Sequence, residues 1–138
     1  KLKLKKNTDK RGFFIEIFRI DQFNYKSKIL QVSHSFTKKK IIKGWHFHKK
    51  QTQWNYLLNG KIKVFLIDNR KKSKTYKKIK SFIIDSNKDK CAYFFPPNIG
   101  HAYITLSKEC HMIYGTSGLY NPNEEYKKKF DKSLITNS

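Results

Sequence analysis

Three histidines and a glutamine have a spacing that could bring them into one pocket. His46 and His48 are two residues apart, Gln53 follows them, and His101 lies downstream. Residues i and i+2 of a β-strand point to the same face, so His46 and His48 would point together into the concave face of a sheet. Imidazoles titrate near neutrality and bind metals, so such a pocket could transfer protons or hold a metal ion.

The residues around these histidines resemble the two sequence motifs of a cupin. The first motif runs from Gly44 to Gly60, and the second is residues 96–101. The first normally has Glu where Gln53 stands, and the second has Gly where Asn98 stands. Asn tolerates the left-handed turn that Gly usually adopts, so the second difference is compatible with the fold. The resemblance implies an all-β, cupin-type double-stranded β-helix, which is a jelly roll.

The strand pattern by itself predicts an antiparallel sandwich or small barrel. Segments rich in β-branched and aromatic residues alternate with turn signals, of which Asn59-Gly60 is a strong hairpin signal. The expected strands are 13–20, 29–36, 45–58, 61–67, 79–84, 92–95, 101–106 and 110–114. A short helix is expected only at the C-terminus, over 122–126. Residues 1–132 should form a single domain and 133–138 a frayed C-terminal tail.

Composition favours a folded protein without disulfides. A chain of 138 residues can bury one core, and 38% hydrophobic with 15% aromatic residues argues against disorder. No apolar run could span a bilayer and no signal-peptide pattern is present, so we expect a cytoplasmic protein with no membrane partner. Cys91 and Cys110 lie far apart without a CxxC motif, which indicates reduced thiols.

The net charge of +21 suggests nucleic-acid binding at first sight. Only three of the 31 basic residues are arginine, however, and the lysines are spread along the chain. Arginine makes the bidentate contacts to bases, so its scarcity argues against a nucleic-acid partner. The lysine excess is typical of an AT-rich coding sequence, and a basic surface suits a small diphosphate ligand.

Beyond the cupin motifs, the chain resembles the dTDP-4-dehydrorhamnose 3,5-epimerase family. The matching segments follow in order over nearly the whole chain: 9–16, 31–35, 43–47, 68–76, 96–101, Tyr114 and 119–122. The resemblance implies a nucleotide-diphosphate-sugar epimerase that acts on a 4-keto-6-deoxy sugar by proton abstraction and return at C3 and/or C5. It also implies that no cofactor is used, and that the protein is a homodimer whose N-terminal strand crosses to the partner subunit.

By this resemblance, His46 is the general base and Tyr114 the acid that returns a proton from the opposite face. The enolate oxygen needs a hydrogen-bond donor, and Gln53 stands where the family has a lysine. Lys43 replaces an arginine and keeps its charge, and His48 replaces a residue that is usually Gln. A carboxylate from the family's C-terminal segment, which orients the base, has no evident counterpart here. The remaining substrate-binding residues implied are Arg11, Phe14, Glu16, Gln31, His101, Tyr120 and Glu125.

Three alternatives stay open at this point. A sugar nucleotide 3,4-ketoisomerase has a similar motif over 44–49, and there His46 and His48 would shuttle protons between adjacent carbons. A metal cupin would use His46, His48, His101 and Gln53 as ligands to a divalent first-row metal. The absent lysine and carboxylate suggest a non-catalytic module that binds nucleotide sugars. His34 and His111 are expected to be structural or exposed.

Overall fold

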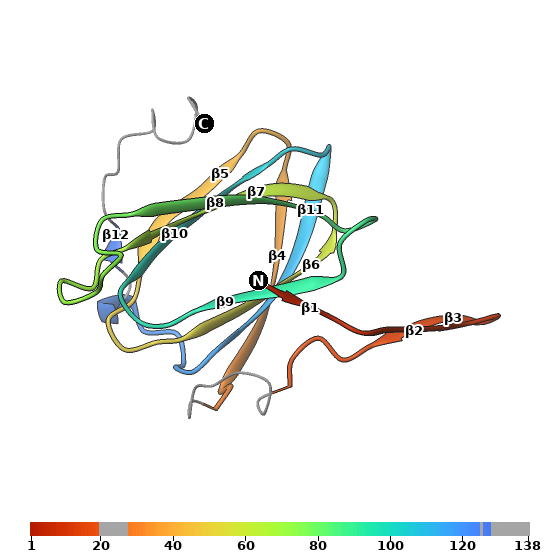
Figure 1. Ribbon diagram of the computed structural model, residues 1–138, viewed down its shortest axis with the longest axis horizontal. Coiled ribbons are helices and arrows are strands. Elements are labelled where there is room, and N and C mark those ends of the chain that lie inside the picture. Colours follow the sequence, from red (N-terminus) through yellow and green to blue (C-terminus); the bar gives the residue numbers. More distant parts are fainter. Residues whose placement is uncertain (20–27, 125, 128–138) are drawn as a thin grey trace.

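The computed structural model describes residues 1–19, 28–124 and 126–127. Two five-stranded antiparallel sheets face each other across the interior, which confirms the predicted all-β jelly roll (Figure 1). The first sheet has the order β1 (Leu2–Lys3), β9 (Cys91–Phe95), β6 (Gln53–Asn59), β11 (Glu109–Thr116) and β4 (Gln31–Lys38). The second has the order β12 (Tyr126–Lys127), β5 (Ile42–Phe47), β10 (Ile99–Thr105), β7 (Lys61–Asp68) and β8 (Ile79–Asp85).

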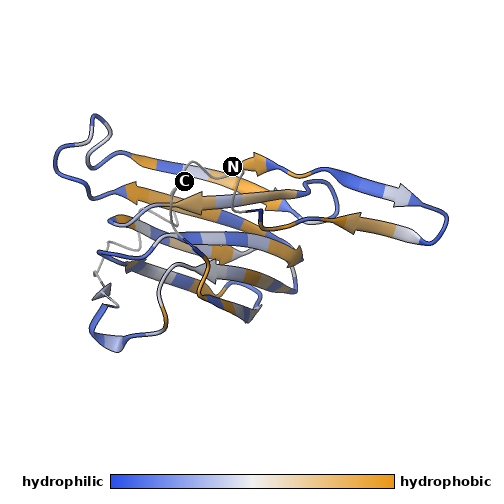
Figure 2. Ribbon diagram, turned by 90° about the horizontal axis from the view of Figure 1, so that it is seen from below, coloured by the Kyte–Doolittle hydropathy of each residue, from blue (hydrophilic) through white to orange (hydrophobic). Residues whose placement is uncertain are grey.

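Alternation of side chains along the strands builds the core. Apolar and polar bands alternate along the ribbon (Figure 2), as expected for strands with one face inward. The larger cluster of buried residues lies between the sheets and includes Leu57, Ile62, Val64, Phe95 and Met112. A smaller cluster of Trp45, Phe65, Ile67 and Ala102 lies on the other face of the second sheet. The core thus fills part of the interior and leaves room for a pocket.

The predicted strand over 45–58 is wrong as a single element. The structure splits it into β5 and β6, which belong to different sheets. The residues between them are tied to the end of β11, because the main-chain N–H of Thr52 donates to the Ser117 hydroxyl and the Ser117 N–H donates to the Thr52 carbonyl. The turn predicted at Asn59-Gly60 is confirmed, with Gly60 at a φ of 104°.

The C-terminal helix expected over 122–126 is also wrong. At this place the structure has the 3-10 turn η2 (Pro122–Glu124), and the short strand β12 follows it. Pairing of β12 with β5 draws the chain into an extended conformation there. Residues 128–138 lie outside the described residues. They include the predicted domain end at residue 132 and the predicted tail over 133–138.

A hairpin of β2 (Lys6–Asp9) and β3 (Gly12–Ile15) extends away from the body of the molecule (Figures 1 and 2). Its two strands pair only with each other. Phe13 and Phe14 are 56% and 63% exposed. The strand predicted over 13–20 therefore ends at Ile15 within the described residues. The hairpin therefore carries two exposed aromatic side chains on a projecting arm.

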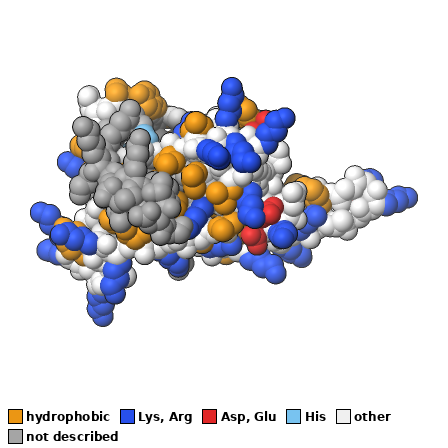
Figure 3. Space-filling model, turned by 90° about the horizontal axis from the view of Figure 1, so that it is seen from above, with side chains coloured by type: hydrophobic (Ala, Val, Ile, Leu, Met, Phe, Trp, Pro, Cys, Tyr) orange, Lys and Arg blue, Asp and Glu red, His pale blue; other side chains and the backbone are white. Residues whose placement is uncertain are grey.

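One face of the molecule carries many basic side chains. Lys and Arg side chains are scattered over the face seen in Figure 3, with exposed hydrophobic side chains between them. In the described part of the chain, no helix has the length and apolar character needed to cross a membrane. Cys91 and Cys110 are buried and form no disulfide, as predicted.

Candidate active site

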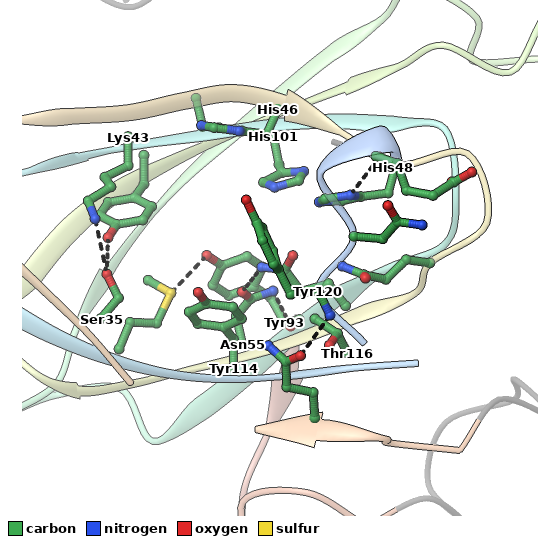
Figure 4. Close-up of a pocket in the computed structure, with 18 residues that line it drawn as sticks. Ser35, Lys43, His46, His48, Asn55, Tyr93, His101, Tyr114, Thr116 and Tyr120 are labelled. Carbon is green, nitrogen blue, oxygen red and sulfur yellow. Dashed lines mark hydrogen bonds between the residues drawn. The ribbon is translucent and has the colours of Figure 1, made fainter. Parts of the chain in front are cut away.

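A pocket opens between the two sheets, and both walls carry polar side chains (Figure 4). The first sheet contributes Gln31, Ser35, Gln53, Asn55, Tyr93, Met112, Tyr114 and Thr116. The second sheet contributes Lys43, His46, His101, Ala102 and Tyr103. Connecting segments add His48, Gln51, Tyr120, Asn121 and Glu124. The pocket therefore gathers most of the residues that the sequence singled out.

The three predicted histidines do lie together. His101 on β10 is paired with His46 on β5, and their ring centroids are 6.1 Å apart. His48 directly follows β5, and its ring lies 5.7 Å from that of His101. Gly44 allows β5 to approach β10 this closely, because a Cβ at Gly44 would be 2.5 Å from the Ala102 Cβ. Close packing of these two strands thus places the histidines.

His101 is held as a neutral imidazole. Its Nδ1 lies 3.3 Å from the Ile99 carbonyl, which can only accept, so Nδ1 carries the proton and Nε2 the lone pair. Burial, together with the neighbouring imidazoles of His48 and His46, lowers the pKa of His101 to about 3. At neutral pH, His101 is therefore suited to accept a hydrogen bond rather than to act as a base.

Buried amides form the facing part of the first sheet. Asn55 Nδ2 donates to the Tyr93 carbonyl over 3.3 Å, which turns Asn55 Oδ1 toward Gln53. Gln53 Nε2 donates to that oxygen over 2.7 Å, and Gln53 is 9% exposed. The Tyr93 carbonyl can only accept a hydrogen bond, and this sets the orientation of both amides. Gln53 Nε2 thus keeps a second N–H for a ligand.

Phenol side chains line both walls of the pocket. Tyr114 projects from β11 into the pocket (Figure 4). Tyr93 is buried, and burial raises the pKa of its hydroxyl, which stays protonated and donates to the Met112 sulfur over 3.6 Å. Burial likewise raises the pKa of Tyr103, whose hydroxyl is 2.9 Å from the Thr37 hydroxyl. Tyr93 on the first sheet and Tyr103 on the second therefore carry hydroxyls that stay protonated over the physiological pH range.

One end of the pocket carries a cation. Lys43 Nζ is 3.5 Å from the Ser35 hydroxyl, which is 3.4 Å from the Tyr103 hydroxyl. Another end is bordered by Tyr120, which is 71% exposed and whose main-chain N–H donates to Gln31 Oε1 over 2.8 Å. Lysine and hydroxyl donors are suited to phosphate oxygens, and an exposed aromatic ring is suited to stacking on a base.

Sequence reasoning missed several lining residues that the strand period could have found. Asn55 is two residues from Gln53 and Tyr103 two residues from His101, so each shares a face with a residue that had been identified. Glu124 was also missed, and its main-chain oxygen lies 3.2 Å from His48 Nδ1. No local pattern indicates Glu124, because pairing of β12 with β5 brings it to the pocket.

Three predicted substrate-binding residues do not line the pocket of their own chain. Arg11 and Phe14 lie on the projecting hairpin, and Arg11 pairs with Asp9 at 2.6 Å. Glu16 follows the hairpin and pairs with Arg19 at 3.3 Å. Their roles stay predictions that depend on a second subunit. Glu125 lies outside the described residues.

The histidines do not have the geometry of a metal site. Metal ligands converge on one point at about 2.0–2.1 Å for imidazole nitrogens. Here the rings of His46 and His48 are each stacked on His101, at interplanar angles of 28° and 25°. Among the described residues, no group of three or more His, Cys, Asp or Glu side chains could hold a metal ion. The metal-ligand alternative thus gains no support.

His34 and His111 lie outside the pocket and contact each other at 2.9 Å.

Several known proteins are similar to this chain in sequence. The family model for dTDP-4-dehydrorhamnose 3,5-epimerase matches residues 1–136. The spore coat polysaccharide biosynthesis protein SpsL of Bacillus subtilis strain 168 is 31% identical over 128 residues, covering 92% of this chain and 83% of SpsL. The dTDP-4-dehydrorhamnose 3,5-epimerase of Methanothermobacter thermautotrophicus is 28% identical over 120 residues, covering 83% of this chain and 64% of that enzyme.

A solved structure has the same fold. The crystal structure of the epimerase RmlC from Legionella pneumophila, in complex with dTDP-4-keto-L-rhamnose, superposes with a TM-score of 0.85 at 22% identity. The superposition covers 96% of this chain and 73% of that chain. With the match to the family model over almost the whole chain, the protein belongs to the dTDP-4-dehydrorhamnose 3,5-epimerase family.

Proposed function

We propose that this protein is an epimerase of nucleotide-diphosphate 4-keto-6-deoxy sugars that exchanges protons at C3 and/or C5. The supporting observation is the pairing of an imidazole, His46, with a phenol, Tyr114, from opposite walls of one pocket. A sugar ring held between the sheets would meet one group on each side. Inversion needs this arrangement, because the proton must leave from one face and return to the other.

The proposed reaction has two steps. His46 takes the proton from the carbon beside the ketone, and the electron pair moves to the ketone oxygen to give an enolate. Tyr114 then donates a proton to the other face of the same carbon and is reprotonated from solvent, while His46 releases its proton to solvent. The second N–H of Gln53 would stabilise the enolate oxygen. Because Gln53 is neutral, it stabilises this charge less than a lysine would, and we expect a slow enzyme or one that inverts a single centre.

The charges around the pocket fit a nucleotide diphosphate. Lys43 lies at the pocket and the chain has a net charge of +21, so a dianionic ligand is attracted to this region. His101 would accept a hydrogen bond from a sugar hydroxyl, since it is neutral with its lone pair on Nε2. The proposed proton transfers are redox-neutral, and we propose that they use no cofactor.

We propose a homodimer in which the β2–β3 hairpin of each subunit reaches the other. Phe13 and Phe14 are more than half exposed on the hairpin, and the edge strand β4 exposes Val32 and Phe36. A partner's hairpin beside β4 would cover these side chains and bring Arg11 toward the pocket. Light scattering should give a dimer for the wild type and a monomer for a Phe13→Asp/Phe14→Asp variant; a dimeric double variant would refute this arrangement.

One observation favours a second candidate, the 3,4-ketoisomerase. His48 gives the pocket another imidazole beside His101, so two histidines could serve adjacent carbons. Proton NMR in heavy water with dTDP-4-keto-6-deoxyglucose tests both candidates. Deuterium at C3 or C5 with the ketone still at C4 supports the epimerase, whereas a ketone at C3 supports the ketoisomerase. Binding without exchange would indicate a non-catalytic module.

A further inference from the structure

A second pair of histidines lies outside the pocket, on the outer face of the first sheet. β4 and β11 are neighbours in this sheet (Figure 1), with His34 opposite Ile113 and His111 opposite Phe36. His34 and His111 are therefore diagonal neighbours on one face, and long side chains can meet across that separation. Ser35 lines the pocket, so the adjacent His34 points away from it.

The two imidazoles turn nitrogen atoms toward each other. His34 Nε2 lies 2.9 Å from His111 Nδ1, and the ring centroids are 5.1 Å apart. A metal ion bound to two imidazole nitrogens at about 2.0–2.1 Å holds them about 2.9 Å apart at a right angle and about 4.1 Å apart in line. The observed separation lies at the lower end of this range. His34 is exposed, so its ring has room to turn toward an ion shared with His111.

The surroundings of His111 favour the tautomer that a metal ion needs. Glu109 Oε1 lies 3.9 Å from Nε2 of His111, which is the nitrogen that does not face His34. A carboxylate favours a proton on the nearer nitrogen, and this leaves the lone pair of His111 on Nδ1. Histidines that bind metals usually have a carboxylate or carbonyl at their second nitrogen in this way. The Phe36 ring, 5.0 Å from that of His111, also limits the orientation of the imidazole.

The charges near the pair have opposing effects on a cation. Glu109 adds a negative charge beside His111, but Lys38 lies opposite Glu109 across the two strands. The Glu109 side chain is 46% exposed, so solvent and salt screen its charge. The net charge of +21 disfavours every cation. Affinity must therefore come from the two bonds to nitrogen, which favours an ion that binds imidazole strongly.

We propose that His34 and His111 form a metal-binding site that takes a divalent transition-metal ion, preferring Cu²⁺ and Ni²⁺ to Zn²⁺. The ion takes the place of the proton on His34 Nε2, which moves to Nδ1 of the same ring through solvent, and water completes the coordination. The short separation fits the right angles of Cu²⁺ and Ni²⁺, whereas the tetrahedral angle of Zn²⁺ needs the nitrogens further apart. This inference does not rest on the proposed epimerase function.

A bound ion would join the edge strand β4 to β11. The inner face of β4 carries Gln31 and Ser35, so the ion would also stabilise one border of the pocket. It would lie between β4 and β11, whereas the proposed partner hairpin would lie beside the free edge of β4. An ion that binds only the folded protein raises the stability of the fold, so Ni²⁺ should raise the Tm of the wild type.

Isothermal titration calorimetry of untagged, chelator-treated protein with nickel chloride tests the site directly. The wild type should bind one ion per chain at this site. His34→Gln/His111→Gln should bind Ni²⁺ at least about tenfold more weakly and lose the rise in Tm. His46→Gln/His48→Gln removes as many imidazoles from the pocket and is the matched control, which should bind like the wild type. Unchanged affinity in the first variant, or loss of binding in the control alone, would overturn the proposal.

Electron paramagnetic resonance with one equivalent of Cu²⁺ then identifies the ligands. The spectrum should show coupling to two imidazole nitrogens in the wild type and to one in His34→Gln. The same spectrum in both proteins would overturn the proposal. Glu109→Gln should lower the Ni²⁺ affinity about tenfold, because the carboxylate no longer holds the His111 tautomer. An unchanged affinity in Glu109→Gln would overturn the role given to this carboxylate.

Discussion

The two walls of the pocket differ in the kind of proton chemistry they offer. The second sheet presents the His46 imidazole from β5 and the neutral His101 imidazole from β10. The first sheet presents the Gln53 and Asn55 amides and the Tyr93 and Tyr114 phenols. One wall is suited to take a proton and the other to donate one and to hold an oxygen. The jelly roll thus supplies an asymmetry that inversion requires, because the imidazoles of β5 and β10 lie on one sheet and Tyr114 lies on the other.

Removing the base from the imidazole wall should have the largest effect. His46→Gln keeps a polar side chain of similar size, and we expect kcat to fall by about a factor of 10³ because general-base catalysis is lost. The Tm should change by only a few degrees, since His46 lies at the pocket surface rather than in the core clusters. Steady-state kinetics and thermal melting check this. An activity above a tenth of the wild type would exclude His46 as the base.

A side chain added at position 44 should push β5 away from β10 and so destabilise the sheet that carries the imidazoles. Gly44→Ala places a Cβ 2.5 Å from the Ala102 Cβ at a φ of 133°, and we expect a loss of about 2–4 kcal/mol in the free energy of unfolding. Gly12→Ala is the matched control, because Gly12 has a φ of 135° but nothing within 4 Å. It should cost about 1 kcal/mol. If urea unfolding gives the same loss in the free energy of unfolding for both variants, the close contact between position 44 and Ala102 does not contribute to the effect.

Weakening the wall formed by the first sheet should cost less than losing the base. Gln53→Met removes the N–H that would bind the enolate oxygen and leaves Asn55 Oδ1 without its donor. We expect kcat to fall about 30-fold with little change in KM, because the donor acts on charge that develops in the transition state. A rise in KM with an unchanged kcat would instead assign Gln53 to ground-state binding.

The predicted effect that is smallest at neutral pH is on stability, and it grows as the pH falls. The pKa of His101 is lowered in the folded protein to about 3, from an ordinary value of 6.5, so the unfolded chain binds the extra proton. Stability should therefore fall as the pH drops from 6.5 toward 3, by about 1 kcal/mol for each pH unit. Urea unfolding of the wild type and of His101→Gln checks this. The variant should lose the part of the pH dependence that His101 contributes. If stability falls with pH equally steeply in both proteins, His101 is not the group responsible.

Local pattern was sufficient for much of the fold and the histidine cluster. The i, i+2 spacing of His46 and His48 and the Asn59-Gly60 turn each act over a few residues, and the structure bears them out. The division of 45–58 was not visible, because no Gly or Pro interrupts that segment and the ties from Thr52 to Ser117 span the chain. Glu124 was hidden for the same reason, since a long-range strand pairing carries it to the pocket.

The most direct test of the two-wall account is proton exchange by the Tyr114→Phe variant. The variant would be mixed with dTDP-4-keto-6-deoxyglucose in heavy water and followed by proton NMR at C3 and C5. If His46 removes the proton and Tyr114 returns it from the other wall, deuterium should still enter with retained configuration while inversion is lost. Inversion at the wild-type rate, or loss of exchange together with inversion, would contradict the division of roles between the two sheets.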